Sequence, residues 1–386
     1  MTRQPLGIAV IGYGWMGRAH THAHSRLLHH FPELSLAPQL LVVADPEPDR
    51  LADAQDRYGF VDARTKWQDV LTDERIGAVS ITAPNFLHRE IGVAMAEAGK
   101  HIWIEKPVGL QAADAQAVAS AVTLSGVQGA VGFNYRNAPA VEHARSLIQA
   151  GAIGQVTNAS FRLLSDYAAH PQGALSWRFE TERGGPGVLG DLASHGVDLA
   201  RFLLGDIASL VAETAIFVPT RPRPTGTGSH FALAAGGELG TVQNEDYLNC
   251  LLRFTSGARG SLEASRVSVG DQNNYGFVVH GSRGMLAWDF RRMGELITSI
   301  GEDYINQPAT TLYIGPGHGE FEAFQPGAGI PLGYDDLKVI EAARFVSSIT
   351  DGKSHGATLA DAVHSANALQ SMVESAATGS WVPVAG

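Results

Sequence analysis

The sequence predicts an α/β protein with an N-terminal doubly wound parallel sheet and a C-terminal α+β domain on a large, open, mainly antiparallel sheet. Three observations support this. Short apolar runs alternate with longer helical stretches up to about residue 135, a glycine-rich turn follows the first run, and alternating strand patterns dominate after residue 135. A chain of 386 residues is long for one domain, so we expect two, at 1–135 and 136–386.

The apolar runs of the first domain are the strands of its predicted sheet. They occupy residues 7–12, 40–45, 78–84, 101–107 and 127–134. Each is apolar on both faces and is separated from the next by a helical stretch, which is the pattern of parallel strands covered by βαβ crossovers. Residues 27–39 lengthen the first crossover, and nothing in their composition explains why.

The second domain mixes helices with alternating strands. We expect helices at 139–150, 189–204, 335–350 and 358–377, with a strand-like run at 156–164. One face of a further strand carries Leu248, Cys250, Leu252 and Phe254. Residues 219–245 are rich in Pro, Gly and Thr, which predicts a long surface loop.

Charge and cysteine content exclude several classes of protein. With 28 Lys and Arg against 39 Asp and Glu, the net charge of -11 offers no general attraction to nucleic acids or anionic lipids. The one cysteine, Cys250, has no second cysteine with which to form a disulfide or a CxxC site. No apolar run approaches the roughly 18 residues of a membrane span. We therefore expect a cytoplasmic protein without nucleic-acid or membrane partners.

A glycine-rich turn, GYGWMG at 12–17, comes directly after the first strand. In such a turn the first glycine permits a tight bend, the second lets the backbone approach a pyrophosphate, and the third lets helix and strand pack closely. The N-terminus of the following helix adds a positive dipole. Because the motif stands between a strand and a helix, it predicts a Rossmann dinucleotide-binding domain at 1–135.

Asp45 ends the second strand, where a carboxylate accepts hydrogen bonds from a ribose 2′-hydroxyl and repels a 2′-phosphate. This favours NAD over NADP, although Arg50 is near enough in sequence to meet a phosphate. The alternative is that Asp45 only caps the turn that follows, as Asp-Pro sequences do.

Motifs from both halves of the chain belong together. In chain order they are GYGWMGRAH (12–20), TAPNFLH (82–88), EKP (105–107), GFNYR (132–136) and GDLASHGVD (190–198). This combination resembles the Gfo/Idh/MocA family of sugar and inositol oxidoreductases. LSWRF (175–179), GPGVLGDLASH and NNY (273–275) are most similar to its dehydrogenases of inositols and unusual hexoses, including scyllo-inositol/L-glucose and levoglucosan dehydrogenases. The resemblance implies that residues 136–386 bind substrate and form a homotetramer or dimer through the large sheet.

Asp191 and His195 are four residues apart on a predicted helix, so we expect them on one face, one turn apart. Oxidising a secondary alcohol needs a base for the hydroxyl proton, and histidine suits this near neutral pH. Lys106 ends a strand whose carboxyl end lines the ligand crevice, where an ammonium favours a developing alkoxide. Taken alone, the residues are also consistent with a surface ion pair and with a lysine paired to Glu105. The resemblance assigns Lys106, Asp191 and His195 to the family's catalytic lysine, aspartate and histidine.

The remaining candidates are contacts to cofactor and substrate. For the cofactor we expect Gly12, Tyr13, Gly14, Trp15, Met16, Gly17, Asp45, Thr82, Pro84, Asn85, His88, Glu105, Lys106 and Asn134. For the substrate we expect Lys106, Tyr135, Asp166, Trp177, Arg178, Asp191, His195 and His318. Pro84 and Asn85 are also a routine turn signal, and His318 is also consistent with an ordinary loop residue.

A run of histidines, His20, His22, His24, His29 and His30, invites a metal hypothesis. These residues lie on the helix after the glycine turn, and His20 matches a position that is often histidine in the family. Neither this run nor the pair Asp191 and His195 shows a full set of ligands at a metal-binding spacing, so we expect no metal. Trp103 and Trp288 fit core packing.

Together these features predict an NAD-dependent dehydrogenase that oxidises a secondary hydroxyl of a cyclic polyol or pyranose to a ketone in carbohydrate catabolism. His195 is the expected general base, Lys106 polarises the hydroxyl, and Asp191 orients substrate and histidine. A scyllo-inositol- or L-glucose-like substrate comes first, and levoglucosan or another glycoside second. An NAD-dependent redox glycosidase and a sensor that binds NAD and sugar without turnover are the alternatives from other classes.

Overall fold

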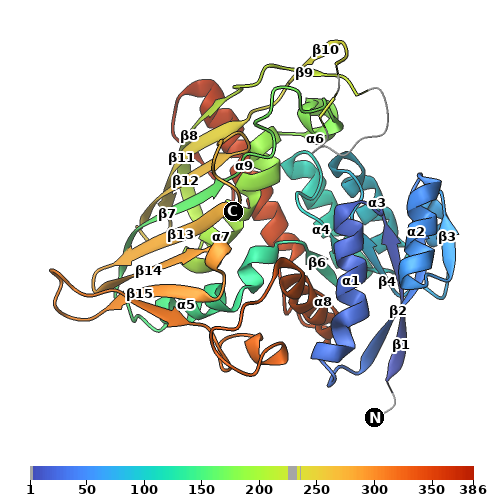
Figure 1. Ribbon diagram of the computed structural model, residues 1–386, viewed down its shortest axis with the longest axis horizontal. Helices are drawn as coiled ribbons and strands as arrows, with labels where there is room; N and C mark the ends of the chain where they lie inside the picture. The colour runs from blue at the N-terminus through green and yellow to red at the C-terminus, as the bar shows by residue number, and fades with distance from the viewer. Residues whose placement is uncertain (1–2, 225–232, 235) are drawn as a thin grey trace. The chain divides into compact units, whose positions relative to one another are not determined.

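The computed structural model describes residues 3–224, 233–234 and 236–386. The chain divides into two compact units (Figure 1). The first unit combines residues 1–137 with 332–363, and the second combines 138–331 with 364–386. The segment 332–363 thus returns to the first unit after the chain has built most of the second. Local sequence patterns hold no sign of this return, because its partners are far away in the sequence.

The first unit is built on a six-stranded sheet with the order β3-β2-β1-β4-β5-β6, in which all neighbours are parallel. The strands are β1 (Gln4–Ile11), β2 (Leu36–Ala44), β3 (Asp62–Arg64), β4 (Ala78–Ile81), β5 (His101–Ile104) and β6 (Gly129–Val131). The helices are α1 (Trp15–His30), α2 (Pro48–Tyr58), α3 (Asn85–Glu97), α4 (Ala112–Ser125) and α8 (Tyr334–Asp351). All four residues of β4 are buried, as expected for a strand covered on both faces. The predicted doubly wound domain is confirmed.

The long first crossover now has an explanation. Helix α1 continues to His30, and β2 begins at Leu36, four residues earlier than the predicted start at residue 40. Only residues 31–35 connect the two elements, a connection of ordinary length for an α/β unit. The prediction of an extended crossover was therefore wrong, because a polar, proline-containing run conceals the first half of a strand.

The second unit contains a nine-stranded sheet with the order β16-β15-β14-β13-β7-β12-β11-β8-β17. The strands are β7 (Val156–Leu164), β8 (Ile207–Ala215), β11 (Tyr247–Phe254), β12 (Arg259–Ser265), β13 (Asn274–Gly281), β14 (Gly284–Asp289), β15 (Glu295–Ile300), β16 (Thr310–Tyr313) and β17 (Val382–Pro383). The pair β7 and β12 is parallel and the other neighbours are antiparallel, so the predicted mainly antiparallel sheet is confirmed.

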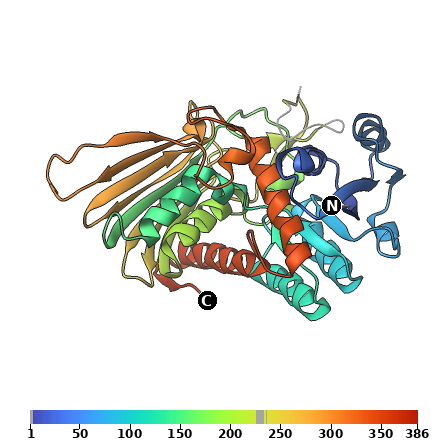
Figure 2. The ribbon, with the colours of Figure 1, turned by 90° about the horizontal axis from the view of Figure 1, so that it is seen from below.

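Helices cover one face of this sheet (Figure 2). Helices α5 (Pro139–Gln149) and α7 (Ser194–Leu204) pack on it. Further helices are α6 (Thr181–Gly184) and α9 (Leu359–Thr378). In β11 the residues Leu248, Cys250, Leu252 and Phe254 are buried and alternate with exposed ones, as predicted. The opposite face is open, and Leu251 on it is 51% exposed.

The expected loop at 219–245 contains a small sheet. Strands β9 (Thr220–Pro222) and β10 (Leu239–Thr241) pair antiparallel, so the prediction of no regular structure was wrong at these ends. Residues 225–232 and 235 of that stretch lie outside the described residues. Among the helices that the structure describes, none is both long and apolar enough to cross a membrane.

Candidate functional site

The glycine turn has the geometry that its sequence predicts. Gly12 has φ +88°, and a Cβ there would lie 2.7 Å from the backbone nitrogen of Ala83. A Cβ on Gly17 would lie 2.1 Å from the carbonyl oxygen of Gly12, so only glycine allows α1 to approach the strand end this closely. A Cβ on Gly14 would meet nothing within 4 Å. The three glycines therefore serve the bend, the close packing and an open backbone surface.

That open surface is the N-terminus of α1. Gly14 is the N-cap and has no side chain with which to accept from the first backbone N–H groups. The first turn, which begins at Trp15 and Met16, contains no acidic residue. Unsatisfied N–H groups and the helix dipole favour an anion here, so the turn fits the pyrophosphate of a dinucleotide.

Asp45 is buried directly after β2. Its Oδ2 accepts from the backbone N–H of Tyr13 at 2.7 Å, and its Oδ1 accepts from the backbone N–H of Glu47 at 3.0 Å. Arg50 reaches Oδ2 at 3.4 Å. The contact with Glu47 is the turn-capping role considered above, while the contact with Tyr13 ties the carboxylate to the glycine turn. These contacts leave room for the predicted role in ribose recognition, because each carboxylate oxygen has more than one acceptor position.

The loop after β4 braces the glycine turn. The Thr82 hydroxyl donates to the carbonyl of Gly12 at 2.5 Å. Pro84 is the N-cap of α3 and Asn85 is its first residue. The His88 side chain is buried with one ring nitrogen 2.7 Å from the carbonyl of Ala83 and the other 2.7 Å from that of Pro107.

Burial lowers the pKa of His88, and a neutral imidazole has one N–H, so it donates to one of these carbonyls at a time. Both ring nitrogens face the backbone of the protein itself. The structure therefore assigns His88 to bridging the loops after β4 and β5, and a direct cofactor contact stays a prediction.

Glu105 and Lys106 follow β5, and the bond between Lys106 and Pro107 is cis. Lys106 is half-buried. The Glu105 carboxylate is buried, and its Oε1 lies 2.9 Å from His20 Nε2 and accepts from Lys338 Nζ at 2.6 Å. Burial alone would raise the pKa of Glu105, but the charge of Lys338 and the hydrogen bond with His20 lower it, so the group is ionised.

Asn134 is fully buried in a 3₁₀ turn after β6, and Tyr135 follows it with 8% exposure. Neither amide atom of Asn134 has a hydrogen-bond partner in the part of the chain that the structure describes. A buried amide without partners is rare because it loses its hydrogen bonds to water and gains none. Because Asn134 follows the end of β6 and has an amide without a partner among the described residues, it fits a group that hydrogen-bonds a ligand.

Asp191 and His195 lie in the second unit, on a less regular segment than predicted. Residues Leu189–Ala193 form a π-helical turn, and α7 begins at Ser194. The predicted helical segment at 189–204 is therefore present, but its first turn, which carries Asp191, is π-helical, and such π turns occur often at functional sites. His195 is buried at 8% exposure, so an ordinary surface ion pair does not describe it.

Tyr167 is the most informative neighbour of Asp191. Its hydroxyl donates a short hydrogen bond to Oδ2 of Asp191. Burial and the charge of Asp191 raise the pKa of Tyr167 well above its ordinary value, so the phenol keeps its proton. Burial likewise raises the pKa of Tyr275 well above its ordinary value, with the charge of Asp191 as the second cause. A buried tyrosine that stays protonated is a permanent donor to the carboxylate.

The other substrate candidates lie in the second unit with partners of their own. Gln272 donates to Asp166 at 3.5 Å. The Arg178 guanidinium carbon lies 4.3 Å above the Trp177 ring centroid, which fits a cation–π contact. His318 Nδ1 accepts from the backbone N–H of Gly315 at 3.2 Å, so that atom serves its own loop.

Comparison with known proteins agrees with this geometry. Residues 6–133 match the family model "Oxidoreductase family, NAD-binding Rossmann fold", and residues 141–287 match the "GFO/IDH/MocA C-terminal domain". The chain is 36% identical over 384 residues to the levoglucosan dehydrogenase of Pseudarthrobacter phenanthrenivorans, covering 99% of this chain and 98% of that one. The chain belongs to the Gfo/Idh/MocA family of oxidoreductases.

Other family members support the same conclusion. The scyllo-inositol 2-dehydrogenase (NAD(+)) of Bacillus subtilis is 30% identical over 264 residues, which is 67% of each chain. A solved structure of levoglucosan dehydrogenase in complex with NADH matches with a TM-score of 0.93 and 35% identity, covering 99% of this chain and 100% of that one. This Gfo/Idh/MocA protein is thus an NAD-dependent oxidoreductase of the sugar and inositol dehydrogenase group, as predicted from its motifs.

Sequence reasoning missed three residues that the structure brings into contact with predicted ones. Tyr167, beside the predicted Asp166, is the donor to Asp191. Lys338 donates to Glu105 and to Glu341, so all three lie in one cluster. One signal was present for Lys338: it is one of only five lysines and stands inside the short apolar run Leu337–Ile340. A lone charge at a buried position requires a partner.

Proposed function

We propose that this dehydrogenase oxidises one secondary hydroxyl of a 1,6-anhydro pyranose or a closely related cyclic polyol to a ketone. The observation that carries this proposal is the similarity to levoglucosan dehydrogenase along the whole chain, which includes 36% identity over 384 residues. The similarity to scyllo-inositol 2-dehydrogenase covers only 67% of the chain. Levoglucosan therefore moves ahead of the scyllo-inositol- and L-glucose-like substrates that we ranked first from motifs alone.

The residues of the chain divide the work as follows. When bound, NAD would supply the acceptor for the hydride that leaves the carbon of the reacting hydroxyl. His195 takes the hydroxyl proton, a role that suits an imidazole near neutral pH. The Lys106 ammonium donates to the same oxygen and favours the alkoxide as it develops. Asp191 orients the imidazole and a neighbouring substrate hydroxyl.

Asp191 serves this role only while it is ionised, and Tyr167 supports that state. A phenol that donates to a carboxylate stabilises the charged form over the protonated form. Because burial keeps the Tyr167 proton in place, the hydrogen bond to Asp191 is available throughout the working pH range. This contact supports a role for an ionised Asp191 in orienting the imidazole and the substrate.

The cofactor contacts fit NAD. The open Gly14 backbone and the uncapped N-terminus of α1 suit the pyrophosphate, and the carboxylate of Asp45 suits a ribose without a 2′-phosphate. Asn134 offers an unpaired amide. We propose these groups, with the backbone of residues 12–17, as the main cofactor contacts.

The test is the initial rate of NADH formation with levoglucosan, scyllo-inositol and L-glucose for the wild type and for Lys106→Ala and His195→Ala. Turnover with one of these sugars that falls by about a hundredfold or more in both variants supports the proposal. Near-wild-type turnover in either variant refutes the assigned roles. Release of a free sugar from a glycoside without net NADH would instead indicate a redox glycosidase, and binding without turnover would indicate a sensor.

We further propose that the protein forms a homotetramer or dimer through the open face of the nine-stranded sheet. Exposed apolar side chains on its strands include Leu251 on β11, Ile297 on β15 and Tyr313 on β16, which are 42–56% exposed. Light scattering on the wild type and on Leu251→Arg tests this. A wild-type monomer would refute it. We retain the cytoplasm as the expected location on the ground of the single cysteine.

A further inference from the structure

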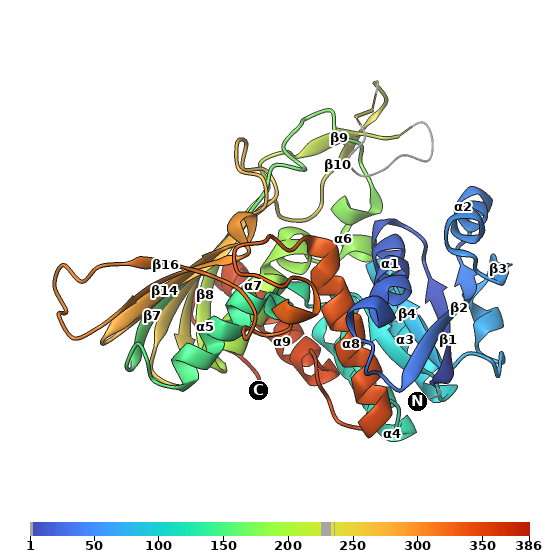
Figure 3. The same cartoon turned by 60° about the horizontal axis from the view of Figure 1, so that its bottom comes forward.

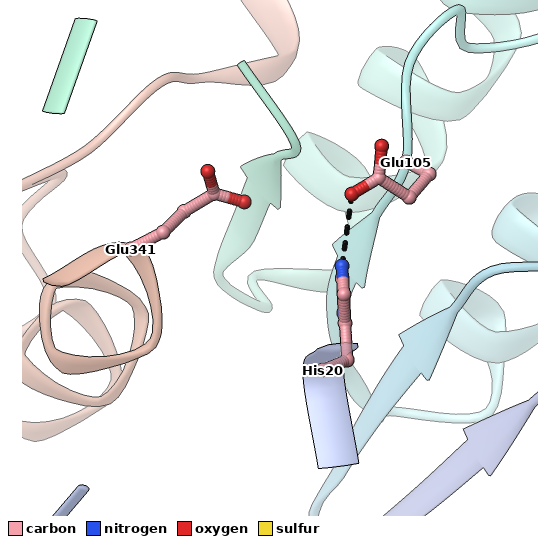
Figure 4. Close-up of side chains that lie close together, drawn as sticks. All are labelled: His20, Glu105 and Glu341. Atoms are coloured by element: carbon pink, nitrogen blue, oxygen red, sulfur yellow. Dashed lines mark hydrogen bonds and ion pairs between the residues drawn. The ribbon is translucent and has the colours of Figure 1, made fainter. Parts of the chain in front are cut away.

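A buried ion cluster lies beneath the loop that carries Lys106. It consists of His20 on α1, Glu105 after β5, and Lys338 and Glu341 on α8, all in the first unit. Figure 4 shows His20, Glu105 and Glu341 turned toward a common space. None of the four residues is more than 8% exposed.

This cluster looks like a metal site, but a side chain provides the cation. One ligand atom each from His20, Glu105 and Glu341 lies within 4.8 Å of the others. The Lys338 ammonium donates to Glu105 Oε1 at 2.6 Å and to Glu341 Oε1 at 3.1 Å. The ammonium therefore holds the position between the carboxylates that a metal ion would take. Burial lowers the pKa of His20 to about 4, so the imidazole adds no charge.

Trp103 ties the cluster to β5. Its indole N–H donates to Glu341 Oε1 at 2.6 Å, and its ring stacks on His20 with centroids 3.6 Å apart. Trp103 and Glu105 are two residues apart, which is the spacing that places side chains on the same side of an extended chain. Both therefore point to the cluster, and α8 contacts the end of β5 and the residue after it through the alternate positions Trp103 and Glu105.

The first turn of α8 contacts the glycine turn. The Tyr334 ring stacks on Trp15 with centroids 5.4 Å apart, and its hydroxyl donates to Met16 Sδ at 3.6 Å. Tyr334, Lys338 and Glu341 follow the spacing i, i+4, i+7, so they share one face of α8. This face contacts the glycine turn, which is expected to bind the cofactor. It also contacts the end of β5 and Glu105, directly before Lys106. Figure 3 shows α8 running beside α1.

We propose that this face of α8 is a brace that positions two functional loops of the first unit. Tyr334 positions the glycine turn for the cofactor, and Lys338, through Glu105, positions Lys106. The second half of this inference rests on the proposed function of Lys106. The first half rests only on NAD binding.

The physical reason for the effect on Lys106 is the cost of a buried charge. Without Lys338, the Glu105 carboxylate would be buried without its cation, so it would take up a proton or move toward water. Either change releases the chain directly before Lys106. Displacement of a reacting group by about 1 Å can lower a rate by roughly a hundredfold.

The decisive variant is Lys338→Met, which keeps an unbranched side chain up to the ε position and removes the ammonium group. Its matched control is Lys100→Met, since Lys100 is also a buried lysine of the first unit but donates to the backbone carbonyls of Asp73 and Ile76, both at 2.9 Å. We expect Lys338→Met to lower kcat by at least about tenfold and Lys100→Met by less than about twofold. A kcat within about twofold of wild type in folded Lys338→Met would overturn the role of Lys338.

A double variant separates positioning from stability. Glu105→Gln with Lys338→Met removes the Glu105 charge together with its cation, and Glu341 keeps its hydrogen bonds from Trp103 and Asn137, so the double variant should fold even where the single variant does not. We expect its thermal stability to recover toward wild type while kcat stays low, because neither side chain holds the other in place. Recovery of kcat together with stability would show a merely structural ion pair and would overturn the proposal.

The other end of the brace is tested by NADH binding without turnover. Tyr334→Leu removes the stacking on Trp15 and should raise the Kd for NADH by about fivefold or more, with kcat at saturating NAD nearly unchanged. Tyr334→Phe keeps the ring and is the control, with a smaller change. An unchanged Kd in Tyr334→Leu would refute this half of the inference.

One measurement on Lys106 needs no substrate. It can therefore test whether Lys338 positions Lys106 even if the proposed catalytic function is wrong. The chain has five lysines, Lys66, Lys100, Lys106, Lys338 and Lys353, which makes reductive ¹³C-methylation a sparse NMR label. We expect the Lys106 signal, identified by its loss in Lys106→Arg, to shift in Lys338→Met but not in Lys100→Met. If no sugar is turned over, a shifted signal still supports the brace, and an unshifted signal overturns it.

Discussion

Acidification should destabilise the first unit through two buried histidines of α1. His20 is fully buried and His24 is 4% exposed, and burial lowers their pKa values to about 4 and about 3. In the unfolded chain each titrates near pH 6.5, so the unfolded state binds more protons below that pH. Their contribution to stability is therefore complete above about pH 6.5 and is lost as the pH falls toward the folded pKa.

The magnitude follows from these values. Between about pH 7 and about pH 5, each histidine reduces the free energy of unfolding by about 2 kcal/mol. The result is insensitive to the folded pKa, because any value at or below about 4 leaves the folded imidazole neutral at pH 5. Glu341 changes in the opposite sense, since burial raises its pKa to about 7 and acid relieves the cost of its charge. The difference between variants is therefore the quantity to measure.

The variant is His24→Gln, and the control is His29→Gln on the exposed side of the same helix. Urea unfolding at about pH 7 and about pH 5 gives the acid-induced loss in the free energy of unfolding for each protein. The transition of the first unit is identified as the one that added NADH shifts to higher urea concentration. We expect the loss in His24→Gln to be smaller than in wild type by about 2 kcal/mol, with His29→Gln like wild type. Equal losses in all three proteins would refute the assignment of a buried neutral His24.

Three further predictions concern individual contacts. Asn134→Leu removes an unpaired amide, so it should raise the Kd for NADH and leave the stability of the cofactor-free protein equal or higher. Lower stability with an unchanged Kd would show a structural role. Tyr167→Phe should move the acid limb of the pH profile of kcat/KM to higher pH by about one unit, because the charged form of Asp191 loses a hydrogen-bond donor. The control variant Tyr275→Phe should move it less, and equal shifts in the two variants would contradict this prediction. Asp45→Ser should raise the NADP to NAD ratio of kcat/KM by about tenfold, and an unchanged ratio would leave Asp45 only its capping role.

Much of the fold of both units could be predicted because the information is local. A glycine that must adopt φ +88° and a glycine that must touch a carbonyl are visible as GYGWMG after an apolar run. The alternation of Leu248, Cys250, Leu252 and Phe254 predicts one buried face of β11 in the same way. Trp103 and Trp288, expected in the core, are 0% and 2% exposed.

The rest could not be predicted because it depends on contacts between distant residues. Lys338 is separated from Glu105 by 233 positions, and no local pattern tells a buried lysine which carboxylate it will meet. The π-helical turn at Asp191 resembles an ordinary helix in sequence, since both place apolar residues at similar intervals. His88 was expected to contact the cofactor, but only the fold shows that both its ring nitrogens face backbone carbonyls.

The most direct test of the account is the rate of NADH formation from NAD with levoglucosan, scyllo-inositol, myo-inositol, L-glucose and D-glucose, with NADP in parallel. We predict turnover with NAD that is highest for levoglucosan, weaker for the inositols and hexoses, and much lower with NADP. No NADH from any of these sugars, with NADH binding intact, would contradict a dehydrogenase of this substrate class.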